Sequence, residues 1–296
     1  MKIISTKLAL QAYLSAFKRS KKQIGFVPTM GALHAGHLSL IERSKAQTAI
    51  TVCSIFVNPT QFNDPADLEK YPRPIAHDRQ LLQTVGCDVL FLPEVKEMYP
   101  DDQEQWEIDL GGLERRWEGA HRPGHYEGVT QIVKKLFDVV QPDSAFFGQK
   151  DYQQCLIIQH MIERLHLPVK LVIGKTLRDA DGLALSSRNV RLSPKGREQA
   201  LALSRALFMV QEQISQKPLA ELRKMTLDFL QQADGVKLEY FAICNAETLE
   251  EITSDTGATS HKRIVVLVAA WVDNVRLIDN VLIDNTGSNR SSKGNL

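Results

Sequence analysis

Residues 24–47 read IGFVPTMGALHAGHLSLIERSKAQ and decide the fold. The apolar run IGFVPT is typical of a buried strand, and LSLIERSKAQ has the composition of a helix. The next residues, 49–57, read AITVCSIFV, and their β-branched side chains predict a second strand. A strand, a helix and another strand in succession form the unit from which parallel sheets are built.

The same alternation continues to about residue 175. We expect further helices and strands, with the helices at 6–19, 77–86, 129–140 and 152–165 and the strands at 88–93, 144–148 and 169–174. Short apolar strands alternating with helices predict a doubly wound parallel sheet with helices on both faces. Residues 1–176 are therefore expected to form a Rossmann-like α/β domain.

The pattern changes after residue 190, where two long helices are predicted before a run of strands. The helices are expected at 193–214 and 218–233, and the strands at 237–249, 262–272 and 274–283. This order predicts a smaller α+β domain over residues 177–283. The polar residues 284–296 have the composition of a flexible tail.

The overall composition excludes several classes of protein. With 43% hydrophobic and 24% charged residues, the 296-residue chain resembles an ordinary globular protein. A formal net charge of +1 gives no reason to expect a nucleic acid or a membrane as partner. The four cysteines are scattered without a C-x-x-C pair, so we expect reduced core thiols and no metal site among them. The first ten residues lack a signal-peptide pattern and no apolar run approaches the roughly 18 residues of a membrane span, which favours the cytoplasm.

The loop at 28–37 is the first candidate site, because ligands of doubly wound sheets bind at the carboxyl ends of strands. Gly31 and Gly36 allow the backbone to approach a ligand, and the helix that follows points free N–H groups at it. His34 and His37 are three residues apart at the helix start and can donate to phosphate oxygens. The alternative is a turn in which one histidine caps the helix. Neither the G-x-G-x-x-G nor the P-loop pattern occurs.

Three further loops carry polar side chains that suit a small anionic substrate. After the second strand, Asn58 and Gln61 supply neutral amides, although on spacing alone this is only a polar loop. After the strand at 144–148, Lys150 offers a charge for phosphate, Asp151 can cap a helix and Gln154 lies one turn further on. An exposed lysine with no ligand is the alternative there.

The loop at 178–189 lies at the expected domain junction. It contains the turn signal Asp181-Gly182 and then Ser186, Ser187 and Arg188, which together can grip phosphate oxygens. A loop at this place can close over a substrate and exclude water, whereas the alternative is a solvated hinge.

Four stretches together resemble one enzyme family. They are PTMGALHAGH, FVNPTQF, EGAHRPGHYEGVTQIVKKLFDVVQPDSAFFGQKDYQQ and DGLALSSRN, in this order across residues 28–189. The chain resembles the pantothenate synthetases, or pantoate–β-alanine ligases, of the HxGH nucleotidylyltransferase superfamily. The resemblance implies a reaction in which pantoate and ATP give pantoyl adenylate and pyrophosphate. The amine of β-alanine then displaces AMP to give pantothenate, a precursor in the coenzyme A pathway.

The resemblance also implies roles for individual residues. Those implied for ATP are Met30, Gly31, Ala32, Leu33, His34, Ala35, Gly36, His37, Gly148, Gln149, Lys150, Asp151, Leu177, Leu185, Ser186, Ser187 and Arg188. Those implied to act in catalysis are His37, His34, Lys150, Ser186, Ser187 and Arg188. Gln61 and Gln154 are implied to bind pantoate, and Gln61 also to border the β-alanine site.

Other implied properties concern the metal, the assembly and the second domain. Mg²⁺ is expected to arrive with ATP, and its protein ligands are unassigned, with Asp78 a possibility that no spacing supports. A homodimer formed through the first domain is implied, and the second domain is expected to act as a lid. Leu185 and Tyr126 depart from the family's usual methionine and phenylalanine, and neither change affects a phosphate ligand.

Three other functions are compatible with parts of the pattern. One is a nucleotidyltransferase that moves AMP or CMP onto a phosphate without amide ligation. The others are a tRNA-binding protein, which the near-zero net charge disfavours, and a nucleotide-binding module without catalytic activity.

Overall fold

The computed structural model describes residues 1–100, 105–254 and 262–284, which fall into two compact units. The first unit comprises Met1–Ala180 and Ala184–Val190, and the second comprises Asp181–Leu183 and the described residues from Arg191 onward. Residues 177–180 and 184–190, which the sequence pattern assigned to the second domain, therefore pack with the first unit. Of the tail expected at 284–296, Asp284 ends a strand, and residues 285–296 lie outside the described residues.

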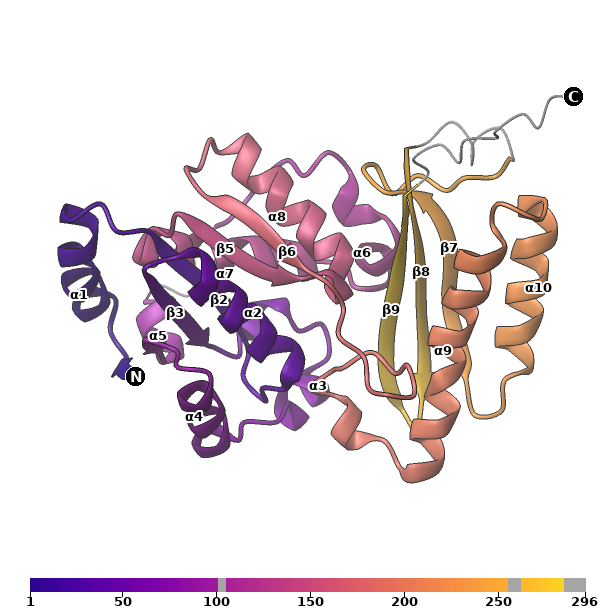
Figure 1. Ribbon diagram of the computed structural model, residues 1–296, viewed down its shortest axis with the longest axis horizontal. Helices are drawn as coiled ribbons and strands as arrows, with labels where there is room; N and C mark the ends of the chain where they lie inside the picture. Colours follow the sequence, from indigo (N-terminus) through magenta and orange to yellow (C-terminus); the bar gives the residue numbers. More distant parts are fainter. Residues whose placement is uncertain (101–104, 255–261, 285–296) are drawn as a thin grey trace, which may run out of the picture. The chain divides into compact units, whose positions relative to one another are not determined.

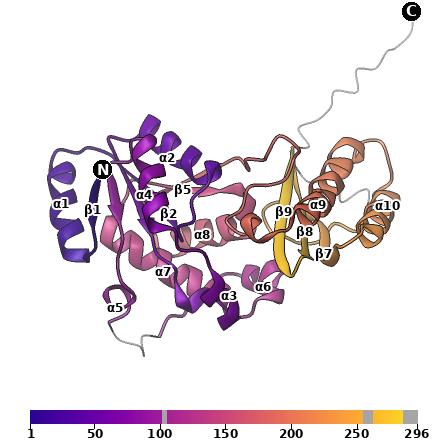
Figure 2. The same cartoon turned by 90° about the horizontal axis from the view of Figure 1, so that it is seen from below.

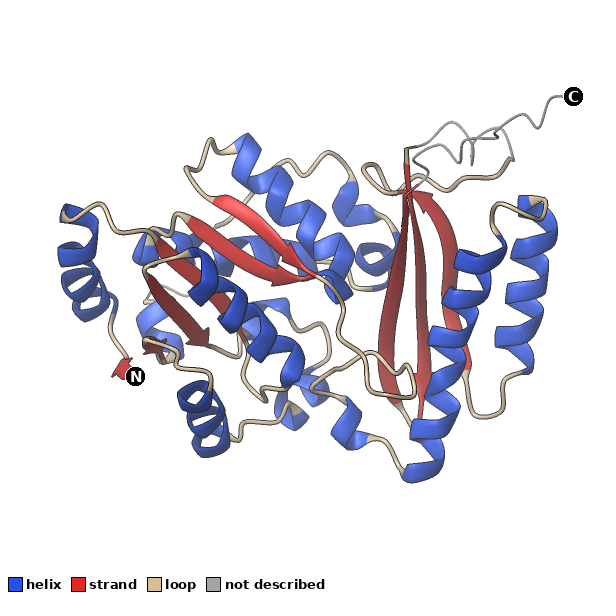
Figure 3. Cartoon of the chain, in the orientation of Figure 1, coloured by secondary structure: helices blue, strands red, loops and turns tan. Residues whose placement is uncertain are grey.

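The first unit contains a six-stranded sheet in which every pair of neighbouring strands is parallel (Figures 1 and 3). Its strands are β1 (Lys2–Ile4), β2 (Ile24–Thr29), β3 (Ile50–Ile55), β4 (Val89–Phe91), β5 (Ser144–Gly148) and β6 (Lys170–Gly174). Their order across the sheet is β1-β4-β3-β2-β5-β6. The doubly wound α/β class predicted from the sequence is thus confirmed. Strand β1 was not predicted, and it pairs with β4 at one edge.

Helices cover both faces of this sheet. The longer ones are α1 (Lys7–Arg19), α2 (Ala35–Gln47), α4 (Ile75–Thr84), α7 (His125–Val140) and α8 (Tyr152–Arg164). Helices α2 and α4 lie on the face opposite to α7 and α8 (Figures 1 and 2). The short helices α3 (Pro65–Lys70), α5 (Val95–Met98) and α6 (Trp117–His121) and the 3₁₀ turns η1 (Pro59–Gln61), η2 (Leu113–Arg115), η3 (Gln149–Asp151) and η4 (Asn189–Arg191) lie in the connections.

The two layers follow from the alternation of side chains along each strand. Phe26 on β2 is buried in the core that α1, α7 and α8 share, whereas its neighbour Val27 is buried in the core under α2 and α4. Successive residues of a strand point to opposite faces, so a strand covered on both sides has no polar face. This explains why β2 and β3 read as continuous apolar runs.

The second unit contains an antiparallel sheet packed against two helices (Figure 3). Its elements are α9 (Pro194–Gln213), α10 (Leu219–Gln232), β7 (Lys237–Asn245), β8 (Arg263–Val272) and β9 (Val275–Asp284), with β8 in the middle of the sheet. Ser193 caps α9 by accepting a hydrogen bond from the N–H of Gly196, and Pro194 occupies the first helical position, as the sequence predicts. The predicted α+β arrangement of this part is confirmed.

All four cysteines lie in the interior, which confirms their prediction as core thiols. Cys53, Cys87, Cys155 and Cys244 are buried and none forms a disulfide. Burial raises the pKa of the Cys87 thiol to about 11, so this group stays protonated near neutral pH. Among the described residues, no helix combines the length and the apolar character needed to cross a bilayer.

Asp78 on α4 holds the loop between β2 and α2 in place. Its two carboxylate oxygens accept hydrogen bonds from the backbone N–H groups of Ala32 (2.9 Å) and Leu33 (2.8 Å). The loop needs such support because Gly31 and Ala32 both have positive φ, of 82° and 49°, and the second conformation is uncommon for alanine. Asp78 is fully buried, and these two bonds satisfy it in the interior. The sequence suggested Asp78 only as a possible metal ligand, whereas the structure uses it to shape the loop.

Replacing Asp78 should therefore destabilise the first unit. In Asp78→Ala both N–H groups lose their acceptor, at about 1–3 kcal/mol for each buried unpaired group, so we expect the free energy of unfolding to fall by about 2–6 kcal/mol. Asp78→Asn keeps one acceptor oxygen, so its free energy of unfolding should lie between those of the native protein and of Asp78→Ala. Urea denaturation followed by circular dichroism measures this, with Arg79→Ala, an exposed neighbour on α4, as the control. An unfolding free energy equal to that of the control would contradict the role of Asp78.

Candidate active site

The candidate site lies where the strand order of the sheet reverses. Strands β2 and β5 are neighbours, and the helices that follow them, α2 and α8, cover opposite faces. Connections that leave in opposite directions open a crevice at the carboxyl ends of the strands, which is where ligands of such sheets bind. A pocket lies there, lined by residues from the loops after β2, β3, β5 and β6, from α7 and from the segment 185–188.

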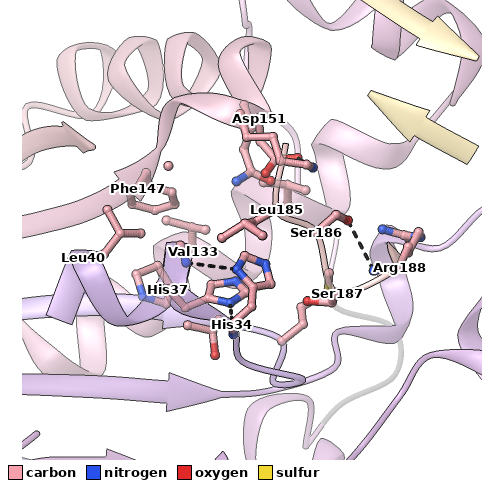
Figure 4. A pocket seen from close by; sticks show the side chains of 18 of the residues that line it. His34, His37, Leu40, Val133, Phe147, Asp151, Leu185, Ser186, Ser187 and Arg188 are labelled. Atoms are coloured by element: carbon pink, nitrogen blue, oxygen red, sulfur yellow. Dashed lines mark hydrogen bonds and ion pairs between the residues drawn. The ribbon is translucent and has the colours of Figure 1, made fainter. Parts of the chain in front are cut away.

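Most of the predicted site residues meet in this pocket. Those among its lining are Met30, His34, Gly36, His37, Gln61, Gly148, Lys150, Asp151, Gln154, Leu177, Leu185, Ser186, Ser187 and Arg188. Figure 4 shows His34, His37 and Leu185 turned toward the same cavity, with Ser186 to Arg188 along its border. Side chains more than 150 positions apart in the sequence, such as His34 and Ser187, are thus brought together.

Five residues predicted to bind ATP do not line the pocket: Gly31, Ala32, Leu33, Ala35 and Gln149. Leu33 is 7% exposed and packs in the core under α2, so its side chain supports the loop from beneath. Gly31 and Ala32 provide the left-handed turn. These residues shape the backbone on which the histidines stand, and a direct contact of any of them with ATP stays a prediction.

The two histidines are held by hydrogen bonds to the start of α2. His34 is the N-cap, and its Nδ1 accepts from the N–H of Gly36 at 3.2 Å. His37 Nδ1 accepts from the N–H of His34 at 3.4 Å, which completes a capping box. An imidazole nitrogen that accepts a hydrogen bond carries no proton, so these bonds assign the neutral Nε2–H tautomer to both rings.

Their surroundings favour the same neutral form. Burial, and then the positive charge of Lys150, lower the pKa of His34 to about 4. Burial, followed by His34 and Lys150, holds the pKa of His37 well below its usual value. The two ring centroids are 4.1 Å apart, a distance at which two imidazolium ions would repel strongly. Both histidines are therefore uncharged donors near neutral pH.

Positive charge in the pocket lining comes from Lys150, Lys175 and Arg188. Lys150 Nζ lies 3.9 Å from Asp151 Oδ1, and Lys150 is close enough to both histidines to lower their pKa values. Arg188 donates to Asp67 on α3 at 2.7 Å and lies 5.5 Å from the centroid of the Tyr71 ring. These contacts fix the direction of the guanidinium, because a bound and stacked arginine loses most of its rotamers.

The segment 185–188 is joined to the first loop by a hydrogen bond. Ser187 Oγ donates to the carbonyl of Ala32 at 2.9 Å, and Ser186 Oγ accepts from the N–H of Arg188 at 3.2 Å (Figure 4). One serine therefore anchors the segment and the other shapes its turn. The carbonyl of Ala32 and the N–H bound by Asp78 belong to the same residue, so the loop is held from two sides.

The pocket lining also combines amides with an apolar wall. Gln61 is 8% exposed, and its Oε1 accepts from Asn58 Nδ2 at 3.2 Å. Gln154 on α8 also lines the pocket. The apolar wall consists mainly of one face of α7, namely Val129, Ile132, Val133 and Leu136. A ligand in this pocket can therefore meet neutral hydrogen-bonding groups as well as branched hydrocarbon.

Several further lining residues were not predicted from the sequence, among them Tyr71, Lys175, Thr176 and the α7 wall. Lys175 and Thr176 could have been suspected because they directly follow β6, whereas Tyr71 stands in a segment without periodic signal. Within the described residues Thr176 Oγ1 is buried and has no hydrogen-bond partner, so it is available to a ligand.

The described residues contain no group of three or more His, Cys, Asp or Glu side chains arranged to hold a metal ion. Asp151 is the carboxylate in the pocket lining. Mg²⁺ often binds through one or two carboxylates together with substrate phosphates, and this donor set fits that pattern.

Comparisons with known proteins agree with this geometry. The family model described as pantoate-beta-alanine ligase matches residues 2–282. The chain is 46% identical to the pantothenate synthetase of Bacteroides thetaiotaomicron over 281 residues, covering 95% of this chain and 98% of the relative. It is 44% identical to that of Cytophaga hutchinsonii over 276 residues, covering 93% and 96%.

Solved structures show the same relationship. The pantothenate synthetase of Thermus thermophilus superposes with a TM-score of 0.88 at 42% identity and covers 95% of this chain and 99% of its own. The pantoate-beta-alanine ligase of Francisella tularensis, solved with beta-gamma ATP and beta-alanine, gives a TM-score of 0.77 at 33% identity, covering 95% and 97%. The chain therefore belongs to the pantoate-beta-alanine ligase family.

Proposed function

We propose that this enzyme condenses pantoate with β-alanine at the expense of ATP, releasing AMP and pyrophosphate through a pantoyl-adenylate intermediate. The observation that carries the proposal is one pocket whose lining combines two kinds of group. Donors suited to phosphate come from His34, His37, Lys150 and Arg188, and amides with an apolar wall line the same pocket. Membership of the family supports the same reaction.

In the first step a carboxylate oxygen of pantoate attacks the α-phosphorus of ATP, and the bond to pyrophosphate breaks. Negative charge grows on the phosphate oxygens in the transition state, so donors fixed in advance stabilise it most. The Nε2–H groups of His34 and His37 are fixed by their Nδ1 contacts, and Lys150 adds positive charge beside them. Neither reactant needs a proton from the enzyme in this step, so His37 acts as a hydrogen-bond donor.

Pantoate fits the amides and the apolar wall of the pocket by its chemistry. It carries two hydroxyls and a carboxylate on one side and two methyl groups on a quaternary carbon on the other. The amides of Gln61 and Gln154 suit the polar groups, and the Val129 to Leu136 face of α7 suits the methyl groups. A site of this kind holds the carboxylate still beside the phosphate, which lowers the entropy lost on reaching the transition state.

In the second step the amine of β-alanine attacks the acyl carbon, an amide bond forms, a proton leaves the nitrogen and AMP departs. The mixed anhydride hydrolyses readily, so the site must exclude water while the amine arrives. Gln61, which borders both proposed substrates, would orient the amine donor after pantoate is activated. A lid function for the second unit remains a prediction from the sequence.

Three finer properties belong to the same proposal. Mg²⁺ would be held by the ATP phosphates, with Asp151 as a candidate carboxylate, and would supply further charge stabilisation. A homodimer and a cytoplasmic location are expected from the resemblance to the family. Gel filtration with light scattering tests the first of these two, and fractionation of the source cells tests the second.

Isotope exchange between pyrophosphate and ATP tests the reaction. With purified enzyme and Mg²⁺, exchange should require pantoate and proceed without β-alanine, and AMP should accumulate only when both are present. Exchange that needs a phosphorylated acceptor in place of pantoate would identify a nucleotidyltransferase. No exchange and no AMP with all substrates present would identify a nucleotide-binding module without catalysis.

His37→Ala and Lys150→Ala should each fold normally and lose about a hundredfold in exchange rate, because each removes a donor that stabilises transition-state charge. His77→Ala and Lys170→Ala serve as matched controls, since both side chains are exposed away from the pocket lining. Exchange within a few-fold of the controls would remove the tested residue from the catalytic set.

The pH dependence separates a neutral donor from an acid. A histidine whose pKa is lowered to about 4 is already uncharged above that value, so the exchange rate of saturated enzyme should stay level from about pH 8 to about pH 6. Only below that range should protonation of His34, beside Lys150 and Asp151, reduce it. A rate that rises as the pH falls through about 6.5 would instead indicate an imidazolium acting as a proton donor.

A further inference from the structure

The backbone of Gln61 is held from behind by side chains that do not reach the pocket. Its carbonyl oxygen accepts a hydrogen bond from His125 Nδ1 at 2.8 Å and a second from Arg122 Nη2 at 3.3 Å. His125 is 6% exposed at the start of α7, and neither it nor Arg122 lines the pocket. Gln61 thus has its side chain in the site and its carbonyl in a separate, buried network.

The hydrogen bonds of His125 define its tautomer. Arg122 Nη1 lies 3.1 Å from His125 Nε2, and a guanidinium can only donate, so Nε2 is the acceptor and Nδ1 carries the proton. The Nδ1–H then donates to Gln61. Glu118 Oε1 accepts from Arg122 Nη1 at 3.3 Å, which compensates the charge of the arginine. Burial, and then Arg122, lower the pKa of His125 to about 4, in agreement with a neutral ring.

Close packing leaves the turn that carries Gln61 little freedom. A Cβ added to Gly128 on α7 would lie 2.5 Å from the carbonyl oxygen of Thr60 and 2.8 Å from the nitrogen of Gln61. Asn58 Nδ2 also donates to the carbonyl of Gly128 at 3.0 Å. The backbone of η1 therefore packs directly against the first turns of α7, and the hydrogen bond from His125 fixes the position of the Gln61 carbonyl within it.

We propose that His125 is a positioning residue that sets the direction of the Gln61 amide toward pantoate through the Gln61 carbonyl. This rests on the proposed function, in which Gln61 binds pantoate. The hydrogen-bonded network Glu118–Arg122–His125 fixes the backbone carbonyl of Gln61, while the side-chain amide of Gln61 serves the pocket. Loss of the Nδ1–H donor leaves the carbonyl with its weaker partner and lets the η1 turn shift, which weakens pantoate binding and leaves ATP binding unchanged.

Two substitutions of His125 distinguish its donor from its bulk. Asn can place its Nδ2–H where Nδ1–H stood, whereas Leu keeps an apolar volume without a donor. We expect His125→Leu to raise the KM for pantoate about tenfold, with the KM for ATP unchanged, and His125→Asn to recover most of this loss. The control is His121→Leu, an exposed histidine on α6. Equal KM values for pantoate in His125→Leu and His125→Asn would overturn the proposal.

A double-mutant cycle with Gln61→Ala tests whether His125 acts through Gln61. If it does, His125→Leu raises the KM for pantoate in the native background but adds little when Gln61 is alanine. Additive effects would show a general structural role and overturn the proposal. His125→Ala, which also lacks the donor, combined with Gln61→Ala completes a second cycle, which decides the question if the leucine variant does not fold.

Nitrogen NMR of histidine-labelled native enzyme gives a readout independent of activity. The His125 ring, assigned by its loss in His125→Asn, should show a protonated Nδ1 and a bare Nε2 down to about pH 5. The reverse tautomer would overturn the proposal. Native enzyme without pantoate-dependent exchange would instead overturn the proposed function and this role with it, whereas normal exchange with additive cycles would overturn the role of His125 alone.

Discussion

The site depends on one topological constraint, the reversal of strand order between β2 and β5. Because α2 and α8 leave their strands toward opposite faces, neither helix can fill the space above the sheet edge between them. The loops after these strands therefore face each other across an opening that neither chain segment can close. His34 and His37 lie in the segment that follows β2 and Lys150 lies in the segment that follows β5. The topology of the sheet therefore brings these positions together, whichever side chains occupy them.

The electrostatic design of the pocket relies on donors without charge. Two protonated histidines beside the cations of this pocket would be repelled by them and would require compensating acids. Here the hydrogen bonds of the α2 start leave both histidines neutral, and the formally charged side chains of the lining are Lys150, Asp151, Lys175 and Arg188. His125 follows the same rule behind Gln61, where a neutral ring lies between an arginine and a backbone carbonyl. In His34, His37 and His125, the hydrogen bond accepted by one ring nitrogen makes the other ring nitrogen the donor.

Much of this arrangement could be predicted from the sequence because strand burial and helix periodicity are local signals. Strands β2 and β5 occur at the predicted residues, and parallel topology then implied that Lys150 and His37 share an edge. Strand β1 has three residues of which only Ile4 is buried, so it lacks the apolar run that marked the equally short β4. Asp78 and His125 were not identified because each acts through a backbone group 45 or more positions away, and a single polar residue in a helix carries no spacing signal.

The hydrogen bond from Ser187 to the carbonyl of Ala32 joins residues 155 positions apart. Between them, Asp181–Leu183 belong to the second unit, and the chain rejoins the first unit at Ala184. The first unit is therefore discontinuous in sequence. A growing chain that ends at residue 176 already contains every strand of the parallel sheet but not the residues that close the site. In sequence order, the parallel sheet is therefore complete before the chain enters the second unit, and the residues that complete the pocket come after it.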